Sequence, residues 1–381
     1  MKRKIIRCLL AGVLAFAAVK GAADVVTRTD HFEIVSSEDD AGLIAREIEE
    51  RFTVYNRLFR FEPAALPGPL RVRAFRDTEA YNSYVGSLFG AGTSGAVYLH
   101  YDKAGQRELV INRSGEDGAL PYQSFLQFLR AFVPHPPAWM REGFAIYFSG
   151  LVLTNEGELS LEENLSWLTA VKAIENPPGL QAILLADTRG RPEPFPALAW
   201  SLVSFFLNSG KEEYTRSLTD SFMTLSASNT AEENAGAVMK RIEQWNNMEN
   251  LTRDYRDYLD SRKTFTELIA AGQRAYAAAD SAGAELAFQA ALDRNPRHYA
   301  PYYYLGLLAY GAKNYALAEE YYFSSLGYGA ESALIFYALG LNAAAAGSGG
   351  SAVDYLRQAA EIAPERYREK TEALIARLPS R

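Results

Sequence analysis

The last third of the chain repeats with a period of 34 residues. Gly272, Gly306 and Gly340 are each 34 residues apart. Three more columns keep this period: Ala284, Ala318 and Ala352; Phe288, Tyr322 and Leu356; and Ala291, Ser325 and Ala359. Small residues in phase let the two helices of a hairpin approach closely, and a large residue fills the gap beside them. Because one such hairpin cannot bury its own apolar face, the units must stack.

This pattern of small, large and small positions resembles the tetratricopeptide (TPR) repeat. The resemblance implies an all-α, superhelical C-terminal domain over residues 264–381. It contains three repeats, at 265–298, 299–332 and 333–366, and residues 367–378 are predicted to form a short cap helix.

The resemblance also implies a concave groove lined by the first helix of each repeat. Taken in phase with the glycines, the candidate binding residues are Tyr276, Tyr303, Leu307, Tyr310, Tyr337 and Leu341, with Ile269, Gln273 and Ala344 at the remaining positions. Tyrosines supply contact area and a polar tip at low entropy cost, so we expect a protein or peptide partner. This set has no lysine or arginine and departs from the basic "carboxylate-clamp" type, which argues against an acidic C-terminus as ligand. Alternatively, some of these tyrosines pack against the first domain or a neighbouring repeat.

Residues 120–150 are predicted to form a pair of helices. The second half, Pro137-Ala-Trp-Met-Arg-Glu-Gly-Phe-Ala-Ile-Tyr-Phe148, resembles the P-x-W-x-x-E-G-x-A-x-Y-F segment of gluzincin metallopeptidases, in particular the peptidase-MA-like group. The resemblance implies an α+β, zincin-like domain over residues 24–263. In that family an upstream H-E-x-x-H helix supplies two zinc-binding histidines and a general base, and a second-helix glutamate, Glu142 here, is the third ligand.

The upstream helix lacks those ligands, because it reads Tyr122-Gln-Ser-Phe-Leu126 where the family has H-E-x-x-H. The four histidines of the chain are at 31, 100, 135 and 298, so none lies in this helix. Gln123 keeps the shape of a glutamate but cannot take a proton from water near neutral pH. The sequence therefore predicts a degenerate peptidase fold with no catalytic residue, no metal and no cofactor. The vestigial positions are Tyr122, Gln123, Leu126 and Glu142.

Two alternatives stay open for this region. One is an active hydrolase with a non-standard metal or active site, built from scattered residues such as His100, His135 and Glu142. The other is an unrelated helix pair that contains the same string. A buried glutamate without zinc needs another partner, and Arg130 and Arg141 are the candidates for a structural salt bridge.

The elements predicted before this helix pair follow the order strand, helix, strand, helix, hairpin. They are a strand at 31–37, a helix at 41–61, a strand at 69–75, a helix at 78–89, and a hairpin of 96–101 and 108–112. Residues 150–260 are predicted to be largely helical. Their almost wholly apolar segment 196–207 resembles the helix that packs behind the active site in the gluzincin family, although any α-rich core would also contain such a helix.

The first residues are predicted to be a secretory signal. Basic residues between Lys2 and Arg7 precede the apolar stretch from Leu9 to Val19, and Gly21-Ala-Ala23 suits cleavage, which gives a mature N-terminus near Asp24. An uncleaved anchor is the alternative, because Lys20 is unusual so close to the cleavage site. No later segment is predicted to span a membrane.

The mature chain is acidic and has no cysteine. Cys8, the single cysteine, lies within the signal, so no disulfide is expected. Removing residues 1–23 leaves 34 basic against 46 acidic residues, a net charge of −12. This charge argues against nucleic acid or an anionic membrane as partner. We therefore expect a periplasmic or secreted, non-catalytic interaction or scaffold protein of the cell envelope.

Overall fold

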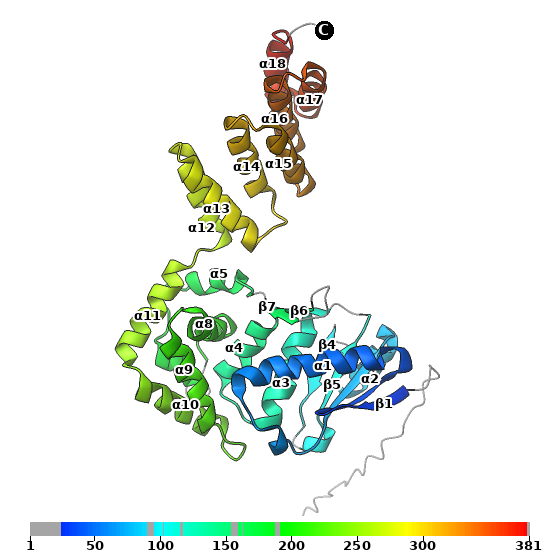
Figure 1. The fold of residues 1–381 in the computed structure, drawn as a ribbon, viewed down its shortest axis with the longest axis vertical. Coiled ribbons are helices and arrows are strands. Elements are labelled where there is room, and N and C mark those ends of the chain that lie inside the picture. Colours follow the sequence, from blue (N-terminus) through cyan, green and yellow to red (C-terminus); the bar gives the residue numbers. More distant parts are fainter. Residues whose placement is uncertain are drawn as a thin grey trace, which may run out of the picture. The chain divides into compact units, whose positions relative to one another are not determined.

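The computed structural model of this chain describes residues 24–89, 95–101, 103–114, 117–153, 159–161, 163–186 and 191–378. The chain divides into two compact units (Figure 1). We call them the α/β unit, which contains the chain up to Asn164 and Asn176–Tyr255, and the helical unit, which contains Leu165–Glu175 and the chain from Arg256 onward. The predicted export signal lies outside the described residues. Within the described ranges, no helix combines the length and apolarity needed to cross a bilayer.

A five-stranded mixed sheet organises the α/β unit, in the order β1-β2-β3-β5-β4. The strands are β1 (Asp24–Arg28), β2 (Phe32–Ser37), β3 (Leu70–Phe75), β4 (Ala96–Leu99) and β5 (Glu108–Asn112). The three central strands β2, β3 and β5 run parallel, while β1 and β4 pair antiparallel at the two edges. In β2 and β3 buried and half-buried residues alternate, as their period of two predicts. Strand β1 was not predicted from the sequence.

The predicted order of elements before residue 120 is confirmed, and a predicted helix pair follows it. The helices are α1 (Glu38–Phe59), α2 (Thr78–Phe89), α3 (Leu120–Phe132) and α4 (Ala138–Phe148). Aromatic rings join α1 to this pair: Tyr55 lies 5.3 Å from Phe125, and Phe59 lies 5.0 Å from Phe144, both measured between ring centroids. These rings are buried, so they position α3 and α4 against the rest of the unit.

Helix α8 (Phe195–Asn208) is the apolar segment predicted from the sequence, and it packs on α4. Their closest approach is at Gly143, where an added Cβ would lie 2.7 Å from the carbonyl carbon of Ala199 and 2.8 Å from a methyl group of Val203. Only glycine fits there, because real Cβ atoms do not approach backbone so closely. This contact gives a packing reason for the glycine that follows Glu142.

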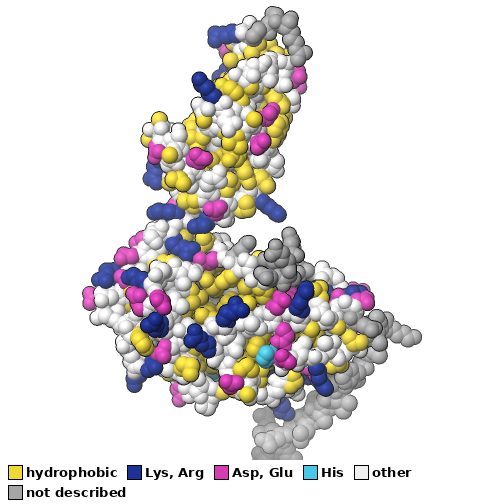
Figure 2. All heavy atoms as spheres, in the orientation of Figure 1, with side chains coloured by type: hydrophobic (Ala, Val, Ile, Leu, Met, Phe, Trp, Pro, Cys, Tyr) yellow, Lys and Arg dark blue, Asp and Glu magenta, His cyan; other side chains and the backbone are white. Residues whose placement is uncertain are grey.

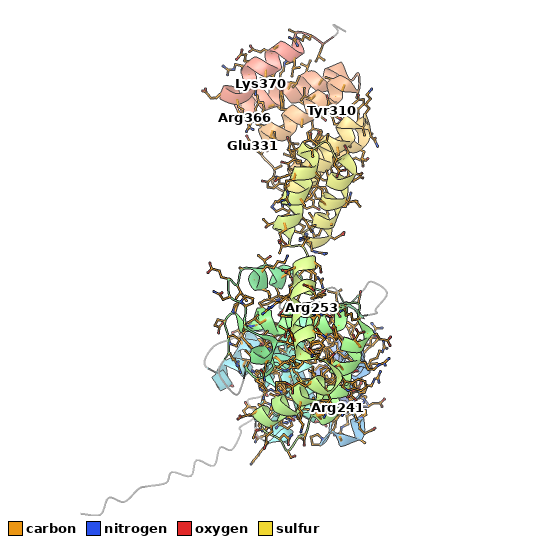
Figure 3. All side chains as sticks on the ribbon, turned by 90° about the vertical axis from the view of Figure 1, so that its left-hand side faces the viewer. Arg241, Arg253, Tyr310, Glu331, Arg366 and Lys370 are labelled. Carbon is orange, nitrogen blue, oxygen red and sulfur yellow. The ribbon has the colours of Figure 1, made fainter. Side chains whose placement is uncertain are left out.

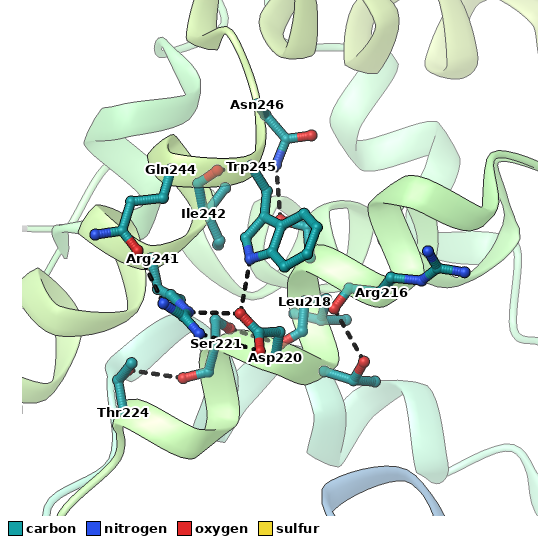
Figure 4. A network of polar contacts seen from close by, with 12 residues as sticks. Arg216, Leu218, Asp220, Ser221, Thr224, Arg241, Ile242, Gln244, Trp245 and Asn246 are labelled. Carbon is teal, nitrogen blue, oxygen red and sulfur yellow. Dashed lines mark hydrogen bonds and ion pairs between the residues drawn. The ribbon is translucent and has the colours of Figure 1, made fainter.

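The remaining elements of the α/β unit are mostly helical, as predicted. They are α6 (Leu180–Leu184), α9 (Glu212–Ser221), α10 (Ala231–Trp245) and the first part of α11 (Met248–Ser261), with a small unpredicted hairpin of β6 (Leu151–Leu153) and β7 (Leu159–Leu161). A polar network joins α9 to α10 (Figure 4). In it the carboxylate of Asp220 accepts hydrogen bonds from Arg241 at 2.5 Å and from the Trp245 indole at 2.7 Å.

The helical unit consists of three hairpins and a final helix, with one hairpin in each predicted repeat. The helices are α12 (Phe265–Ala277), α13 (Ser281–Arg294), α14 (Tyr299–Gly311), α15 (Tyr315–Gly327), α16 (Ser332–Ala345), α17 (Gly349–Ile362) and α18 (Pro364–Ile375), together with the short α5 (Ser166–Lys172). Lys172 of α5 pairs with Glu267 at the start of α12, at 3.0 Å. This ion pair ties α5 to the first hairpin.

The three glycines make the same contact in each hairpin. An added Cβ would lie 2.6 Å from Phe288 at Gly272, 2.5 Å from Tyr322 at Gly306, and 2.7 Å from Leu356 at Gly340. The predicted close approach of two helices, with a large residue of the second helix against a glycine of the first, is therefore confirmed.

The turn inside each hairpin repeats as well. Ala279, Lys313 and Gly347 all have left-handed backbone, with φ of 60°, 59° and 81°. At each turn the next residue donates its N–H to the carbonyl five residues back, as Asp280 does to Ala275 at 2.9 Å. The sequence did not predict this repeated turn position, because alanine, lysine and glycine share no side-chain property.

Candidate functional site

Helices α3 and α4 bring two of the vestigial positions into direct contact. The hydroxyl of Tyr122, near the start of α3, donates a hydrogen bond to Oε2 of Glu142 on α4 at 2.7 Å. Burial raises the pKa of Tyr122, and the adjacent Glu142 carboxylate raises it further, because it would repel a phenolate. The phenol therefore keeps its proton at neutral pH and remains a donor to Glu142.

Gln123 is bound to the sheet. Its side-chain carbonyl accepts a hydrogen bond from the backbone N–H of Tyr98 on β4, at 3.0 Å. Leu126, one turn further along α3, is half-buried. Neither side chain can act as a proton acceptor for water, so the described geometry gives both a packing role.

Glu142 has one of the two expected partners and a further one. Arg141 forms the expected ion pair with Oε1 of Glu142, at 3.5 Å, whereas the side chain of Arg130 makes no hydrogen bond or ion pair with the described residues. The shorter contact of Glu142 is the hydrogen bond from Tyr122. The sequence singled out both Tyr122 and Glu142, but not as a contacting pair.

The residues named for a scattered metal site have other contacts. Nδ1 of His100 lies 3.4 Å from the Tyr98 hydroxyl, and the backbone carbonyl of His135 accepts a hydrogen bond from Asn234 at 3.0 Å. In the part of the chain that the structure describes, no three histidine, cysteine, aspartate or glutamate side chains are grouped so that they could hold a metal ion.

The helical unit contains a pocket of about 270 Å³, formed by α14, α15, α16 and α18. Five of the six candidate binding residues line it: Tyr303, Leu307, Tyr310, Tyr337 and Leu341. Tyr276 does not line it, and its ring instead contacts Tyr304 at 5.8 Å between centroids. The phase of the repeat therefore selected residues that the fold gathers around one cavity.

Three of the pocket tyrosines combine half-buried rings with unpaired hydroxyls. Tyr303 and Tyr310 pack against a buried cluster that includes Tyr322, so their rings contribute to packing, as one alternative expected. Among the described residues, however, no group accepts or donates a hydrogen bond at the hydroxyls of Tyr303, Tyr310 and Tyr337. Burial raises the pKa of Tyr303, and the neighbouring Tyr304, Tyr367 and Tyr276 raise it further. The hydroxyl of Tyr303 therefore keeps its proton at neutral pH.

Tyr322 belongs to the pocket although the sequence assigned it to packing alone. Its ring lies against Gly306, and the residue is 1% exposed, yet it lines the pocket. Its hydroxyl has no hydrogen-bond partner among the described residues. Burial raises its pKa, and Tyr303, Tyr276 and Tyr310 add to this. Among the described residues, the polar atoms that are fully buried without a partner do not include this hydroxyl, so it is accessible to a group that enters the pocket.

The final helix, α18, also contributes to the pocket, which the sequence did not predict. Arg366, Tyr367 and Lys370 of α18 line the cavity, and the Tyr367 ring lies 4.9 Å from that of Tyr337. The expectation that the groove lacks lysine and arginine holds for the candidate positions on the first helices of the repeats. It is wrong for the pocket as a whole, because α18 folds back onto α17 and brings two basic residues to the cavity.

Comparison with known proteins does not add a relative. No protein-family model matches this chain, and no curated protein matches it. The function of this chain is therefore inferred from the contacts of its own residues.

Proposed function

We propose that this chain is an exported, non-catalytic protein that binds a protein or peptide partner through the tyrosine-lined pocket of its helical unit. The observation that carries this proposal is the convergence of five residues, chosen by repeat phase alone, on one pocket whose tyrosine hydroxyls lack partners among the described residues. In this proposal the helical unit is a set of three tetratricopeptide repeats with a cap helix. The repeated contacts of Gly272, Gly306 and Gly340 support that assignment.

We further propose that the α/β unit is a degenerate gluzincin-like, peptidase-MA-like domain that serves as a scaffold. The hydrogen bond from Tyr122 to Glu142 supports this, because it uses both side chains to hold α3 and α4 together. Under this proposal, combining Tyr122→His, Gln123→Glu and Leu126→His creates a site that binds about one zinc ion per chain with Glu142 as third ligand. The same triple variant with Glu142→Gln is the control, and equal zinc binding by both would contradict the assignment.

The binding function is tested by selecting random peptides on phage against the purified chain. We expect enriched peptides whose affinity falls about tenfold, or 1.4 kcal/mol, when Tyr303→Phe is combined with Tyr310→Phe. These changes keep the rings that pack against the cluster and remove only the hydroxyls. Tyr299→Phe is the matched control, because Tyr299 is exposed and does not line the pocket. Failure to enrich any peptide, or equal loss in the control, counts against the proposal.

Export is tested separately by sequencing the N-terminus of protein recovered from the envelope fraction. A terminus near Asp24 supports a cleaved signal and a periplasmic or secreted location. Recovery of Met1 supports an uncleaved anchor instead.

A further inference from the structure

The pocket of the helical unit has a distinct polarity. Its charged lining residues are Arg366 and Lys370, which lie four positions apart on α18 and so share one helix face. Among the described residues, no acidic side chain lines it. Figure 3 shows both basic residues on α18, at the end of the helical unit that also carries Tyr310 and Glu331. The charge at the pocket is therefore positive, although the chain as a whole is acidic.

The two basic groups differ in how they are compensated. Arg366 donates to both carboxylate oxygens of Glu331, at 2.8 and 3.0 Å, and lies 5.1 Å above the centre of the Tyr367 ring. Lys370 has no hydrogen bond or ion pair with any described residue. The uncompensated charge at the pocket is therefore the ammonium group of Lys370.

The other polar groups of the pocket are tyrosine hydroxyls, which can donate as well as accept hydrogen bonds. The hydroxyl of Tyr322, on a residue 1% exposed, and those of Tyr303 and Tyr310 have no partner among the described residues. Between them the lining is apolar, with Leu307 and Leu341 on the first helices of two repeats. A carboxylate beside an apolar side chain matches this lining, because the carboxylate accepts from Lys370 and from the hydroxyls and the apolar side chain packs on the leucines.

The size of the cavity restricts how much of a ligand it holds. At about 270 Å³ it lies just below the usual range of small-molecule sites, which begins at about 300 Å³. It suits one or two side chains of a longer chain whose backbone stays outside.

We infer that the pocket selects a peptide segment in which an aspartate or glutamate stands next to a large apolar residue. The carboxylate pairs with Lys370 and accepts hydrogen bonds from the tyrosine hydroxyls, and the apolar side chain packs against the leucines. This inference rests on the proposed binding function and specifies the class of partner, namely an acidic, partly apolar segment of another protein. Electrostatic attraction to an exposed lysine is screened by salt, so the affinity falls as ionic strength rises.

The test uses the same phage selection with the wild-type chain, Lys370→Glu and Arg368→Glu. Arg368 is the matched control, because it is exposed on the same helix and does not line the pocket. We expect the wild type to enrich peptides with Asp or Glu beside Leu, Phe, Tyr or Trp. Lys370→Glu should weaken those peptides about tenfold or more, which corresponds to 1.4 kcal/mol, and Arg368→Glu should retain them. Circular dichroism establishes that all three proteins keep their helices.

A selected peptide is then synthesised with Asp→Asn or Glu→Gln, and separately with its C-terminus amidated. Loss of binding on the side-chain change, but not on amidation, supports the inference. The reverse result overturns it in favour of a terminal carboxylate. Peptides that bind in a Tyr303- and Tyr310-dependent way without acidic residues overturn the inference and leave the proposed function standing. If no peptide is enriched, the proposed function itself fails.

Discussion

In the α/β unit the Tyr122 hydroxyl donates to Glu142 at 2.7 Å, whereas in the helical unit the hydroxyls of Tyr303 and Tyr310 have no partner among the described residues. The sequence marked Tyr122 as a vestigial position, and it marked Tyr303 and Tyr310 as candidate binding residues. In the first case the fold satisfies the polar group with one of its own carboxylates. In the second case the fold holds the ring and leaves the hydroxyl at a cavity.

The difference is informative because a satisfied polar group and an unsatisfied one have opposite energetic consequences. Tyr122 and Glu142 lose a charge-assisted hydrogen bond if either is changed, so they stabilise the folded state. A donor that faces a pocket adds little to folding but can stabilise a complex. The comparison predicts where substitutions reduce stability and where they reduce binding.

The largest expected effect is on the free energy of unfolding, and it compares a close helix–helix contact at a glycine in each unit. Gly143→Ala places a methyl group against the backbone of Ala199, which cannot move aside, and we expect a loss of about 3 kcal/mol in the free energy of unfolding. Gly306→Ala meets the Tyr322 ring, which can tilt toward the pocket, so about 1.5 kcal/mol is expected. Urea unfolding followed by hydrogen exchange, read peptide by peptide in each unit, measures both.

The control for this contrast is Gly86→Ala, because an added Cβ at Gly86 in α2 meets nothing within 4 Å. Removing glycine from a helix interior should stabilise the protein by about 0.5–1 kcal/mol. If Gly143→Ala were as well tolerated as Gly86→Ala, the described contact between α4 and α8 would be wrong.

The next effect tests the tyrosine comparison directly. Tyr122→Phe removes the donor to Glu142, and we expect a loss of about 1.5 kcal/mol. Tyr310→Phe removes a hydroxyl without a described partner, so the change in unfolding free energy should stay within about 0.5 kcal/mol. Urea midpoints of the two variants decide the matter. Equal losses would mean that the Tyr310 hydroxyl is bonded within the protein and is not free for a ligand.

Smaller effects are expected at the left-handed turns. Ala279→Gly and Lys313→Gly should each stabilise the helical unit by about 0.5–1 kcal/mol, because glycine adopts this backbone without a Cβ clash. Gly347→Ala should destabilise it by a similar amount. The counterpart in the α/β unit is Arg60, which ends α1 with φ of 54°, and Arg60→Gly should be stabilising as well. Thermal unfolding followed at 222 nm measures each change, and a stabilising Gly347→Ala would contradict the shared turn geometry.

The smallest effect concerns acid. Arg76 lowers the pKa of Asp40, Arg241 lowers that of Asp220, and Lys211 lowers that of Asp254, all in the α/β unit. A carboxyl with a lowered folded-state pKa contributes stability above its unfolded pKa and loses it as pH falls through the folded value. The α/β unit should therefore weaken below about pH 4, by a modest amount because these pairs are exposed.

In the helical unit, Glu267 is a carboxyl whose pKa is also lowered. Its burial raises the pKa, but the backbone N–H of Thr264 and the ammonium of Lys172 together lower it. Hydrogen exchange at pH 7 and pH 3, read peptide by peptide, should show the larger loss of protection in the α/β unit. A larger loss in the helical unit would contradict this ordering.

The sequence by itself determined the repeated hairpins and the order of elements before residue 120. Periodicity is a local property of the chain, so the 34-residue spacing of Gly272, Gly306 and Gly340 was sufficient to predict the hairpin contacts. The absence of an H-E-x-x-H pair is likewise visible in the residues alone. Strand β1 escaped prediction, because its short, half-exposed segment has no strong pattern and is defined by pairing with β2.

Only the tertiary structure decided how side chains from distant positions meet. Tyr122 and Glu142 are 20 residues apart, and the pairing depends on how α4 is held between α3 and α8. Lys370 lines the same pocket as Tyr303, although the two residues lie far apart in the sequence, because α18 turns back after the last hairpin. Spacing along one helix is set by its pitch, whereas contacts between helices depend on how all side chains of the interface pack together. For that reason the tyrosines around the pocket could be predicted from the sequence, but the positive charge of the pocket could not.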